Sequence, residues 1–199
     1  MENSKAKKQL LDASEKLMLK KGFSATTVDE ICRKAKLTKG SFFHYFESKE
    51  GLGKAVLERF CCSHRNKVGA ACCHLLPDDD PLQRLYTHIE FAIDSSKAKS
   101  VPDGCLLGVF SQELSHTSPH MRSLCAQGFR EWGKILRRDF VVVKKQCKSK
   151  KTFDVNRMVI FFLALLEGSQ ILAKVMRDNR IVGKNLRYFK RYLKYVLEK

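Results

Sequence analysis

Polar and basic side chains gather between Thr38 and Lys49 at a spacing that suits contact with DNA. Lys39 can reach the acceptor atoms of guanine or a phosphate, and the hydroxyls of Thr38 and Ser41 can bond to bases or phosphates. Gly40 removes a side chain at a point where the backbone can approach DNA closely. These residue types in this order therefore indicate a surface that reads DNA.

Lys49 offers a second kind of contact, because it falls in the first turn of a helix that Ser48 is expected to cap. A helix N-terminus carries partial positive charge and disfavours a cation beside it. An anion held between the ammonium group and the helix N-terminus would remove this conflict. A DNA phosphate is the candidate anion.

Two short helices joined by a tight turn are expected to position these side chains. Thr27 stands three residues before Glu30, which is the spacing of a capping box and starts one helix. After a few residues around Lys36 and Leu37, Thr38 can cap the next helix. This is the helix-turn-helix arrangement, in which the second helix lies in the major groove and presents its N-terminal residues to the bases.

The aromatic residues of the second helix cannot all be internal. Phe42 and Phe46 share one face at helical spacing and are expected in the core. A helix this short cannot also enclose Phe43, His44 and Tyr45, so some of these three must be exposed. Exposed aromatic side chains indicate a binding surface, which agrees with contact to DNA.

Residues 4 to 60 resemble the N-terminal domain of the TetR/AcrR family of bacterial one-component repressors. The stretch that carries the resemblance is LLDASEKLMLKKGFSATTVDEICRKAKLTKGSFFHYFESKEGL. The resemblance implies the following DNA contacts, of which the last two are to backbone phosphates: Thr27, Thr38, Lys39, Gly40, Ser41, Phe43, His44, Tyr45 and Lys49.

Two positions depart from the pattern of that family. Phe43 stands where the family often has Tyr, so a phenolic contact to phosphate is lost. Lys36 stands where the family often has Gly, in the turn between the two helices. Two alternatives follow: either Lys36 adopts a left-handed backbone conformation at modest cost, or the turn is altered.

Length and composition predict an all-α fold. The 199 residues are 44% hydrophobic and 30% charged, with only 4 Pro and 11 Gly, which excludes disordered, collagen-like and β-sandwich chains. We expect a three-helix, helix-turn-helix DNA-binding domain over residues 1–50, with the motif at about 27–46. The resemblance implies a helical regulatory and dimerisation domain over residues 51–199. Helices are also expected over residues 4–21, 49–74, 81–96, 105–115, 119–146, 154–178 and 181–198.

Positive charge is concentrated in the part of the chain that does not hold the motif. The net charge is +17, which favours a polyanionic partner such as nucleic acid. Residues 144–199 hold 15 Lys and Arg against 4 Asp and Glu, while residues 1–60 hold 13 against 8. The prediction of double-stranded operator DNA as a partner therefore rests on the motif and not on bulk charge.

Hydropathy predicts a protein that does not enter a membrane. The longest apolar run, Met158–Leu166, has nine residues, where a membrane span needs about twenty. The N-terminus has no apolar signal segment. We therefore expect a cytoplasmic protein with no membrane partner, in which the 8 Cys are reduced thiols.

The last two expected helices predict a homodimer. Residues 158–166 are apolar on every side, which marks a helix buried all round, and a partner subunit is the simplest source of neighbours. The final helix carries an apolar stripe, for which an ordinary core face is the alternative interpretation. The predicted interface residues are Phe162, Leu166, Phe189, Leu193 and Leu197.

The resemblance also implies that a small-molecule effector binds the C-terminal half and releases the repressor from its operator. Large apolar residues between positions 85 and 175 are candidates for the pocket, although each also fits a core position. With Cys105 and Lys174 added, the candidates are Phe91, Cys105, Leu107, Phe110, Phe129, Trp132, Phe162 and Lys174. Few acidic residues lie in this half, which favours a neutral, anionic or electrophilic effector over a cation.

Cys105 suggests an alternative mode of control. It opens a helix after Gly104, where the helix dipole lowers the pKa of a thiol, and Lys174 would stabilise a thiolate if it faced the same pocket. The two interpretations are a redox- or electrophile-switched repressor that acts through Cys105, and a buried cysteine that serves as a small hydrophobic residue.

The remaining chemistry of the sequence does not assemble into a metal or catalytic site. The stretches CCSH at 61–64 and CCH at 72–74 contain metal-ligand residue types. Their offset of eleven residues is about 16.5 Å along a continuous helix, which is too far for one zinc ion. No phosphate-binding loop, GxSxG or HExxH motif is present. We therefore expect no metal, no cofactor and no enzymatic activity.

Overall fold

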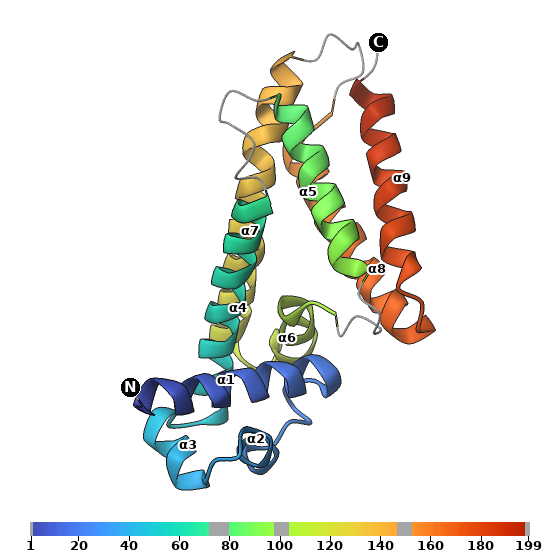
Figure 1. Cartoon of the computed structure of the whole chain (residues 1–199). Helices are drawn as coiled ribbons and strands as arrows, with labels where there is room; N and C mark the ends of the chain where they lie inside the picture. The colour runs from blue at the N-terminus through green and yellow to red at the C-terminus, as the bar shows by residue number, and fades with distance from the viewer. Residues whose placement is uncertain (1, 72–79, 98–103, 147–152, 198–199) are drawn as a thin grey trace. The chain divides into compact units, whose positions relative to one another are not determined.

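The computed structural model describes residues 2–71, 80–97, 104–146 and 153–197, and the regular structure in these ranges is entirely α-helical (Figure 1). The helices are α1 (Glu2–Lys21), α2 (Val28–Ala35), α3 (Lys39–Tyr45), α4 (Lys49–Ala71), α5 (Pro81–Ser96), α6 (Leu106–Leu114), α7 (Pro119–Gln146), α8 (Val155–Met176) and α9 (Arg180–Leu197). The all-α fold class predicted from the sequence is confirmed.

Capping signals in the sequence set where helices begin. Asp80 accepts a hydrogen bond from the Leu82 N–H at 3.0 Å, and Pro81 is the first residue of α5. Proline suits this position because the first N–H of a helix has no intrahelical partner. The fourth helix, predicted to reach about residue 74, is described to Ala71. The cysteine and histidine cluster at 72–74 therefore lies outside the described residues.

The chain folds into two compact units, which we describe separately. The first unit consists of Met1–Ser63 and Cys105–Gly128, and the second of His64–Gly104 and Phe129–Lys199. The predicted division at residue 50 does not follow this grouping, because α6 packs against α1. A helix from the middle of the sequence therefore belongs structurally with the N-terminal helices.

A small hydrophobic core holds the N-terminal helices of the first unit together. Leu10 of α1, Ile31 of α2 and Phe42 of α3 are fully buried. Phe46 is buried beside Phe42, with ring centroids 6.0 Å apart, as predicted. Burial stabilises the fold by about 1.5–3 kcal/mol for each such side chain, so these contacts fix the three helices against one another.

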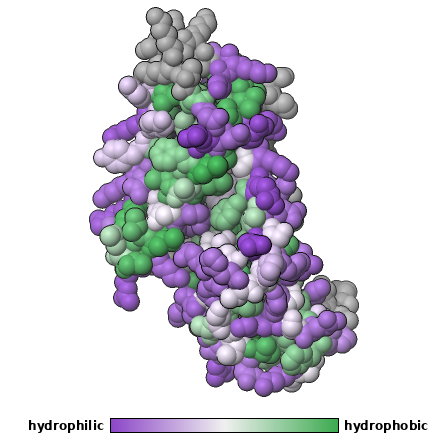
Figure 2. All heavy atoms as spheres, turned by 180° about the vertical axis from the view of Figure 1, so that it is seen from behind, coloured by the Kyte–Doolittle hydropathy of each residue, from purple (hydrophilic) through white to green (hydrophobic). Residues whose placement is uncertain are grey.

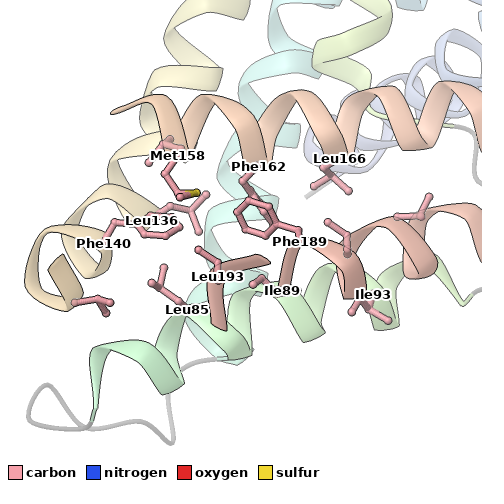
Figure 3. Packing of buried hydrophobic residues seen from close by; sticks show 14 of the residues in the cluster. Leu85, Ile89, Ile93, Leu136, Phe140, Met158, Phe162, Leu166, Phe189 and Leu193 are labelled. Carbon is pink, nitrogen blue, oxygen red and sulfur yellow. The ribbon is translucent and has the colours of Figure 1, made fainter. Parts of the chain in front are cut away.

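Helices α5, α7, α8 and α9 enclose the core of the second unit. Figure 3 shows Met158, Phe162 and Leu166 of α8 directed toward α9. The ring centroids of Phe162 and Phe189 are 5.4 Å apart, and Leu193 is fully buried. The other labelled members of the cluster are Leu85, Ile89 and Ile93 of α5 and Leu136 and Phe140 of α7.

This core corrects the residues predicted for the dimer interface. Phe162, Leu166, Phe189 and Leu193 are between 0% and 3% exposed within one chain, and Leu197 packs against the same cluster. A partner subunit cannot reach side chains that the chain itself encloses. On α9 the apolar stripe is an ordinary core face, the alternative interpretation raised by the sequence. On α8 residues 158–166 are apolar on every side, so periodicity does not say which face points inward.

The opposite faces of α8 and α9 carry large hydrophobic side chains at the surface. On α8, Ile160 is 65% exposed and Val175 is 76% exposed, and on α9 Tyr188 is 67% exposed. The same two helices also expose Phe161, Ile171, Leu172, Met176, Tyr192 and Tyr195. Figure 2 shows hydrophobic side chains gathered at the surface in the view from behind. Residues 158–166 of α8 are apolar on every side, but within one chain this stretch is not buried on every side, since Ile160 and Phe161 are exposed.

Among the described residues, α8 is the one helix that is long and apolar enough to cross a membrane. This finding rests on length and composition alone, and core helices of soluble proteins meet the same criterion. The side of α8 that carries Met158, Phe162 and Leu166 packs in the core of the second unit.

A buried ion pair joins α5 to α7 inside the second unit. Asp139 is fully buried, and Arg84 Nε donates to its Oδ1 at 3.0 Å. His88 Nε2 lies 3.7 Å from the other carboxylate oxygen. Burial raises the pKa of the Asp139 carboxyl, but the contacts with His88 and Arg84 outweigh burial and hold this pKa below its usual value.

Arg84→Met is expected to lower the free energy of unfolding by about 3–5 kcal/mol at neutral pH, because it leaves the Asp139 carboxylate buried without its cation. The stabilisation of the wild type is present above the unfolded-state pKa of about 3.9. It is lost as pH falls through the lower folded-state pKa, so the difference between the two proteins shrinks in acid. Urea denaturation at several pH values measures both effects.

Arg138→Met is the matched control for this experiment. Arg138 Nε lies 3.5 Å from the same Asp139 oxygen, but its side chain is 71% exposed, so its loss should have little effect. Equal decreases in the free energy of unfolding for Arg84→Met and Arg138→Met would show that the buried ion pair stabilises the protein no more than the exposed one.

Candidate DNA-binding site

Helix α2 begins with the capping box that the sequence predicts. Thr27 Oγ1 accepts a hydrogen bond from the Glu30 N–H at 3.3 Å, and Glu30 Oε2 accepts one from the Thr27 N–H at 3.0 Å. The Lys21 ammonium also donates to Glu30, at 2.5 Å. The hydrogen bonds from Lys21 and Thr27 lower the pKa of the Glu30 carboxyl to about 2. The capping carboxylate is therefore ionised throughout the physiological pH range.

Lys36 adopts the left-handed conformation, the first of the two alternatives raised by the sequence. Its φ is 58° and its ψ is 42°. The Lys36 N–H donates to the Arg33 carbonyl at 3.2 Å, and the Leu37 N–H donates to the Cys32 carbonyl at 2.9 Å. These bonds close α2 in the way that a C-terminal glycine usually does. The tight turn is kept although lysine occupies the position.

Helix α3 presents its N-terminal turn to solvent. Thr38 caps the helix by accepting a hydrogen bond from the Ser41 N–H at 3.1 Å. Lys39 and Gly40 are exposed, and a Cβ added at Gly40 would meet only the Thr38 hydroxyl, at 3.8 Å. Packing inside the chain therefore does not require glycine at this position. The open backbone suits close approach by an external molecule.

The aromatic residues of α3 divide between core and surface as the sequence predicts. Phe42 is buried, whereas Phe43 is 55% exposed. His44 is exposed, and Tyr45 is half-buried with its ring centroid 4.8 Å from that of His44. The predicted DNA-contacting residues that lie together on α3 and its cap are Thr38, Lys39, Gly40, Ser41, Phe43, His44 and Tyr45.

Lys39 forms an ion pair that the sequence analysis missed. Its ammonium lies 2.7 Å from Asp29 Oδ1, so the pair connects α3 to the first turn of α2. The hydrogen bond with Asp29 raises the pKa of Lys39. Both side chains are more than 60% exposed, so DNA can exchange with Asp29 as the partner of Lys39. Acidic residues are common in the first turn of a helix because the helix dipole favours them there. Asp29 in the sequence therefore did not indicate an ion pair with Lys39.

The structure gives Lys49 a role different from the predicted phosphate contact. Its Nζ donates to the carbonyl oxygens of Phe23 at 3.1 Å, Ser24 at 3.3 Å and Thr26 at 3.1 Å. An ammonium group has three hydrogens, so these three carbonyls use all of them. The prediction that an anion relieves the charge conflict at the start of α4 was wrong in its partner, because backbone oxygens do so.

The residues predicted for an effector pocket divide between the two units. Cys105, Leu107 and Phe110 belong to the first unit and are buried. Phe110 packs against Phe23 with ring centroids 5.3 Å apart, and Leu107 lies against Gly128, where an added Cβ would be 2.7 Å from Leu107 Cδ2. These side chains are therefore core contacts of the first unit.

The other predicted pocket residues belong to the second unit. Phe91, Phe129 and Trp132 are half-buried, and the Trp132 ring centroid lies 4.4 Å from that of His64. Phe162 fills the core between α8 and α9, and Lys174 is exposed on α8, so the pocket lining stays a prediction. Among the described residues, no group of His, Cys, Asp and Glu is arranged to hold a metal ion.

Two protein-family models match the chain. Residues 10–56 match the model for bacterial regulatory proteins of the tetR family, and residues 81–189 match the tetracyclin repressor-like C-terminal domain. The chain belongs to the TetR family of transcriptional regulators. Helices α2 and α3 lie within the first match, so the exposed turn described above belongs to the DNA-binding part of a TetR-family regulator.

Known TetR-family regulators are similar along most of the chain. The transcriptional repressor DhaR of Mycobacterium sp. (strain GP1) is 26% identical over 180 residues, which cover 89% of this chain and 87% of DhaR. AcuR of Cereibacter sphaeroides is 30% identical over 172 residues, 86% of this chain and 78% of AcuR. The solved structure of the reduced form of E. coli NemR superposes with a TM-score of 0.79 at 25% identity, covering 94% of this chain and 95% of NemR. These relatives are transcriptional regulators and not enzymes.

Asp29→Asn is expected to raise the affinity for duplex DNA of any sequence by about threefold to tenfold at low salt, because it removes a negative charge beside Lys39. The gain should shrink as salt screens the surface charges. Fluorescence anisotropy with a random-sequence duplex at several salt concentrations measures both. Glu58→Gln is the control, because it removes an exposed carboxylate from α4. An Asp29→Asn protein that binds no better than this control would show that Asp29 does not limit DNA binding.

Proposed function

We propose that this TetR-family chain is a dimeric repressor that binds a palindromic operator through α3 and is released by a small-molecule effector bound to its C-terminal half. The observation that carries the proposal is the exposed N-terminal turn of α3, anchored from behind by the buried Phe42. In a helix-turn-helix this end of the second helix meets the base edges of the major groove. DhaR and NemR are repressors, which favours the same direction of control.

The contacts to DNA are assigned by the chemistry of the exposed groups. Lys39 and the hydroxyls of Thr38 and Ser41 suit base edges, and the Tyr45 hydroxyl suits a backbone phosphate. Lys49 is left out of the contact set, because its ammonium hydrogens are directed at carbonyl groups of the same chain. The proposed contact residues are Thr27, Thr38, Lys39, Gly40, Ser41, Phe43, His44 and Tyr45.

A second copy of the chain is the proposed cover for the exposed apolar faces of α8 and α9. TetR-family regulators act as dimers, and these faces expose Ile160, Val175 and Tyr188 to solvent. Gly168 lies on the same side of α8, and a Cβ added there meets nothing within 4 Å. Ala164 stands one turn earlier and is exposed, while Gly168 is half-buried. Two small residues at this spacing allow a partner helix to approach closely. Covering of α8 by protein also supports a cytoplasmic protein with no membrane partner.

Gly168→Glu tests the dimer and the operator together. The single chain has open space for the new side chain, and replacing a helical glycine favours the helix, so the variant should fold. The added charge would be buried without a partner in the dimer, so sedimentation should show a monomer. DNA selected from a random pool by the wild type should contain two inverted half-sites. The monomer should bind that DNA at least about a hundredfold more weakly, because it loses the second half-site contact.

Gln83→Glu is the matched control, since it adds the same charge at an exposed position of α5. It should stay dimeric and bind normally. A dimeric Gly168→Glu protein would exclude this face as the interface. Selected DNA without inverted half-sites would contradict binding of a palindromic operator.

A second candidate mode of control acts through Cys105, the alternative raised by the sequence. Cys105 is the N-cap residue of α6, after Gly104 with a φ of +95°, which agrees with the helix start predicted at this position. An electrophilic quinone would react by addition: the sulfur bonds to a ring carbon, the carbon–carbon π bond breaks, and a proton from water completes the adduct. The new group would need space, since Cys105 is only 7% exposed.

A variant that keeps Cys105 and has the other seven cysteines replaced by Ser or Ala tests this mode. If Cys105 is the sensor, a quinone should release the variant from its selected operator, and the further change Cys105→Ser should abolish the response. Mass spectrometry should find one adduct for each released chain. A variant that binds its operator normally and ignores the quinone would show that Cys105 is only a packed residue.

A further inference from the structure

The loop that joins α1 to α2 is held by a carboxylate from a distant part of the sequence. Glu113 of α6 accepts a hydrogen bond from the Phe23 N–H at 3.2 Å through Oε1. It accepts a second one from the Ser24 N–H at 2.7 Å through Oε2. Two successive backbone donors that converge on one anion form a concave anion-binding site in the backbone. Here the chain itself supplies the anion, 90 and 89 residues away in the sequence.

Gly22 makes room for this carboxylate. Its φ is +91°, in the region that favours glycine, and its N–H donates to the Met18 carbonyl at 2.9 Å to close α1. A Cβ at this position would lie 1.9 Å from Glu113 Oε1, far inside the contact distance of non-bonded heavy atoms, so the carboxylate would have to move. The conformation of the loop and the position of the Glu113 carboxylate therefore depend on each other.

Lys49 binds the backbone carbonyl groups of the same loop. The carbonyl oxygens of Phe23, Ser24 and Thr26 accept the three ammonium hydrogens, while two of the N–H groups in the loop donate to Glu113. The loop thus presents its donors to an anion from α6 and its acceptors to a cation from α4. Each charged group is matched to backbone dipoles, which gives stronger hydrogen bonds than neutral partners do.

The held loop leads directly into the DNA-binding helices. Thr26 Oγ1 donates to the Gly22 carbonyl at 2.7 Å, which folds the loop back on itself just before the N-cap residue of α2, Thr27. Helix α2 in turn leads to α3 through the left-handed turn at Lys36. A shift of the loop would therefore move the start of α2 and, with it, the exposed turn of α3.

We propose that Glu113 is a positioning residue for operator recognition: it holds the loop between α1 and α2, and through this loop it orients α2 and α3 for the bases. This inference rests on the proposed operator binding and adds a residue outside the N-terminal helices on which sequence-specific binding depends. Glu113 contacts no DNA in this account and its loss removes no cation, so sequence discrimination should fall while the general attraction to the phosphates is kept.

Loss of the carboxylate should disturb the position of the loop more than the fold. Ser24 is exposed, so water can replace Glu113 at its N–H group. The Phe23 ring stays anchored by its contact with Phe110, whose ring centroid lies 5.3 Å away. Glu113→Ala is therefore expected to fold, with a loop that samples more than one position.

The experiment compares Glu113→Ala, Glu113→Gln and the control Glu58→Gln in the full-length dimer. Affinity is measured by anisotropy for the operator selected by the wild type and for a random-sequence duplex, across a range of salt. Glu113→Ala should bind the operator about tenfold or more weakly, because two hydrogen bonds to a charged group are lost. Its affinity for random DNA should stay within about twofold, with an unchanged salt slope, because no cation is lost. Glu113→Gln should fall between, since its amide oxygen can still accept a hydrogen bond.

Two further variants test whether the effect passes through the loop. Gly22→Ala leaves the Glu113 carboxylate in the chain but fills its place, so it should reproduce the loss of operator binding seen with Glu113→Ala. Lys49→Met removes the opposite hold on the same loop. Its effect and that of Glu113→Ala should not be additive in the double variant, because both act on one element.

The outcomes separate this inference from the proposed function. A wild-type protein that selects no preferred sequence would contradict the proposed operator binding itself. If the wild type selects an operator and Glu113→Ala binds it as tightly as Glu58→Gln does, Glu113 is not a positioning residue. Equal losses for operator and random DNA, together with a lower folded fraction in circular dichroism, would likewise overturn the inference, because Glu113 would then only support the fold.

Discussion

The seven residues of α3 are too few to form a stable helix alone in water, so the DNA-reading surface depends entirely on what holds this helix in place. Phe42 and Phe46 anchor it to the core of the first unit, Thr38 caps its start, and the left-handed turn at Lys36 sets its angle to α2. The inward side chains are fully occupied by this task. The residues between them are left at the surface, which is why they are available to DNA.

Three cations of the N-terminal segment have partners within the chain. Lys21 pairs with Glu30, Lys39 pairs with Asp29, and Lys49 binds three carbonyl oxygens. Part of the positive charge in residues 1–60 is therefore bound to groups of the chain itself before DNA is present. Recognition must depend on the geometry of α3 and on two copies acting together, more than on bulk attraction. The ion pair with Asp29 holds the Lys39 side chain in the absence of DNA. The Asp29 carboxylate would also repel the phosphates of a bound duplex.

Local signals in the sequence predicted the local structure well. Thr27 with Glu30, Thr38 and Asp80 each marked a helix start through a hydrogen bond that spans two or three residues. The residues that make such a bond are close in the sequence, so their types and spacing reveal it. The inward faces of α8 and α9 could not be predicted in the same way. Phe161 and Phe162 are adjacent and equally apolar, yet one is 45% exposed and the other 2%. Which of them points inward is decided by α5 and α7, whose packing no pattern within α8 encodes.

The contacts of Lys49 and Glu113 were missed for a related reason. Lys49 binds backbone carbonyl oxygens, and every residue has one. The partners of Lys49 therefore cannot be predicted from the side-chain types in the sequence. Glu113 reaches its two donors across some ninety residues, and a carboxylate in a helix has many ordinary explanations. Both contacts fall on the same loop, which begins at Gly22 directly after α1. The left-handed φ of Gly22 is a local feature, but the reason for it is the distant carboxylate that occupies the missing side chain's place.

The two long-range features have opposite consequences for how the chain works. The exposed faces of α8 and α9 are not needed to fold one chain, since a complete core lies on their other side, so pairing of two copies can change without loss of the fold. The contact of Glu113 joins α6 to the entrance of α2, so within the first unit the fold and the orientation of the reading helix are not separable. Any event that displaces α6 must either carry the loop with it or break two hydrogen bonds to a charged group. A ligand or modification that acts on α6 therefore has a direct physical route to α3. In the proposed dimer, one that acts on the outer faces of α8 and α9 would alter DNA binding by changing how two copies meet.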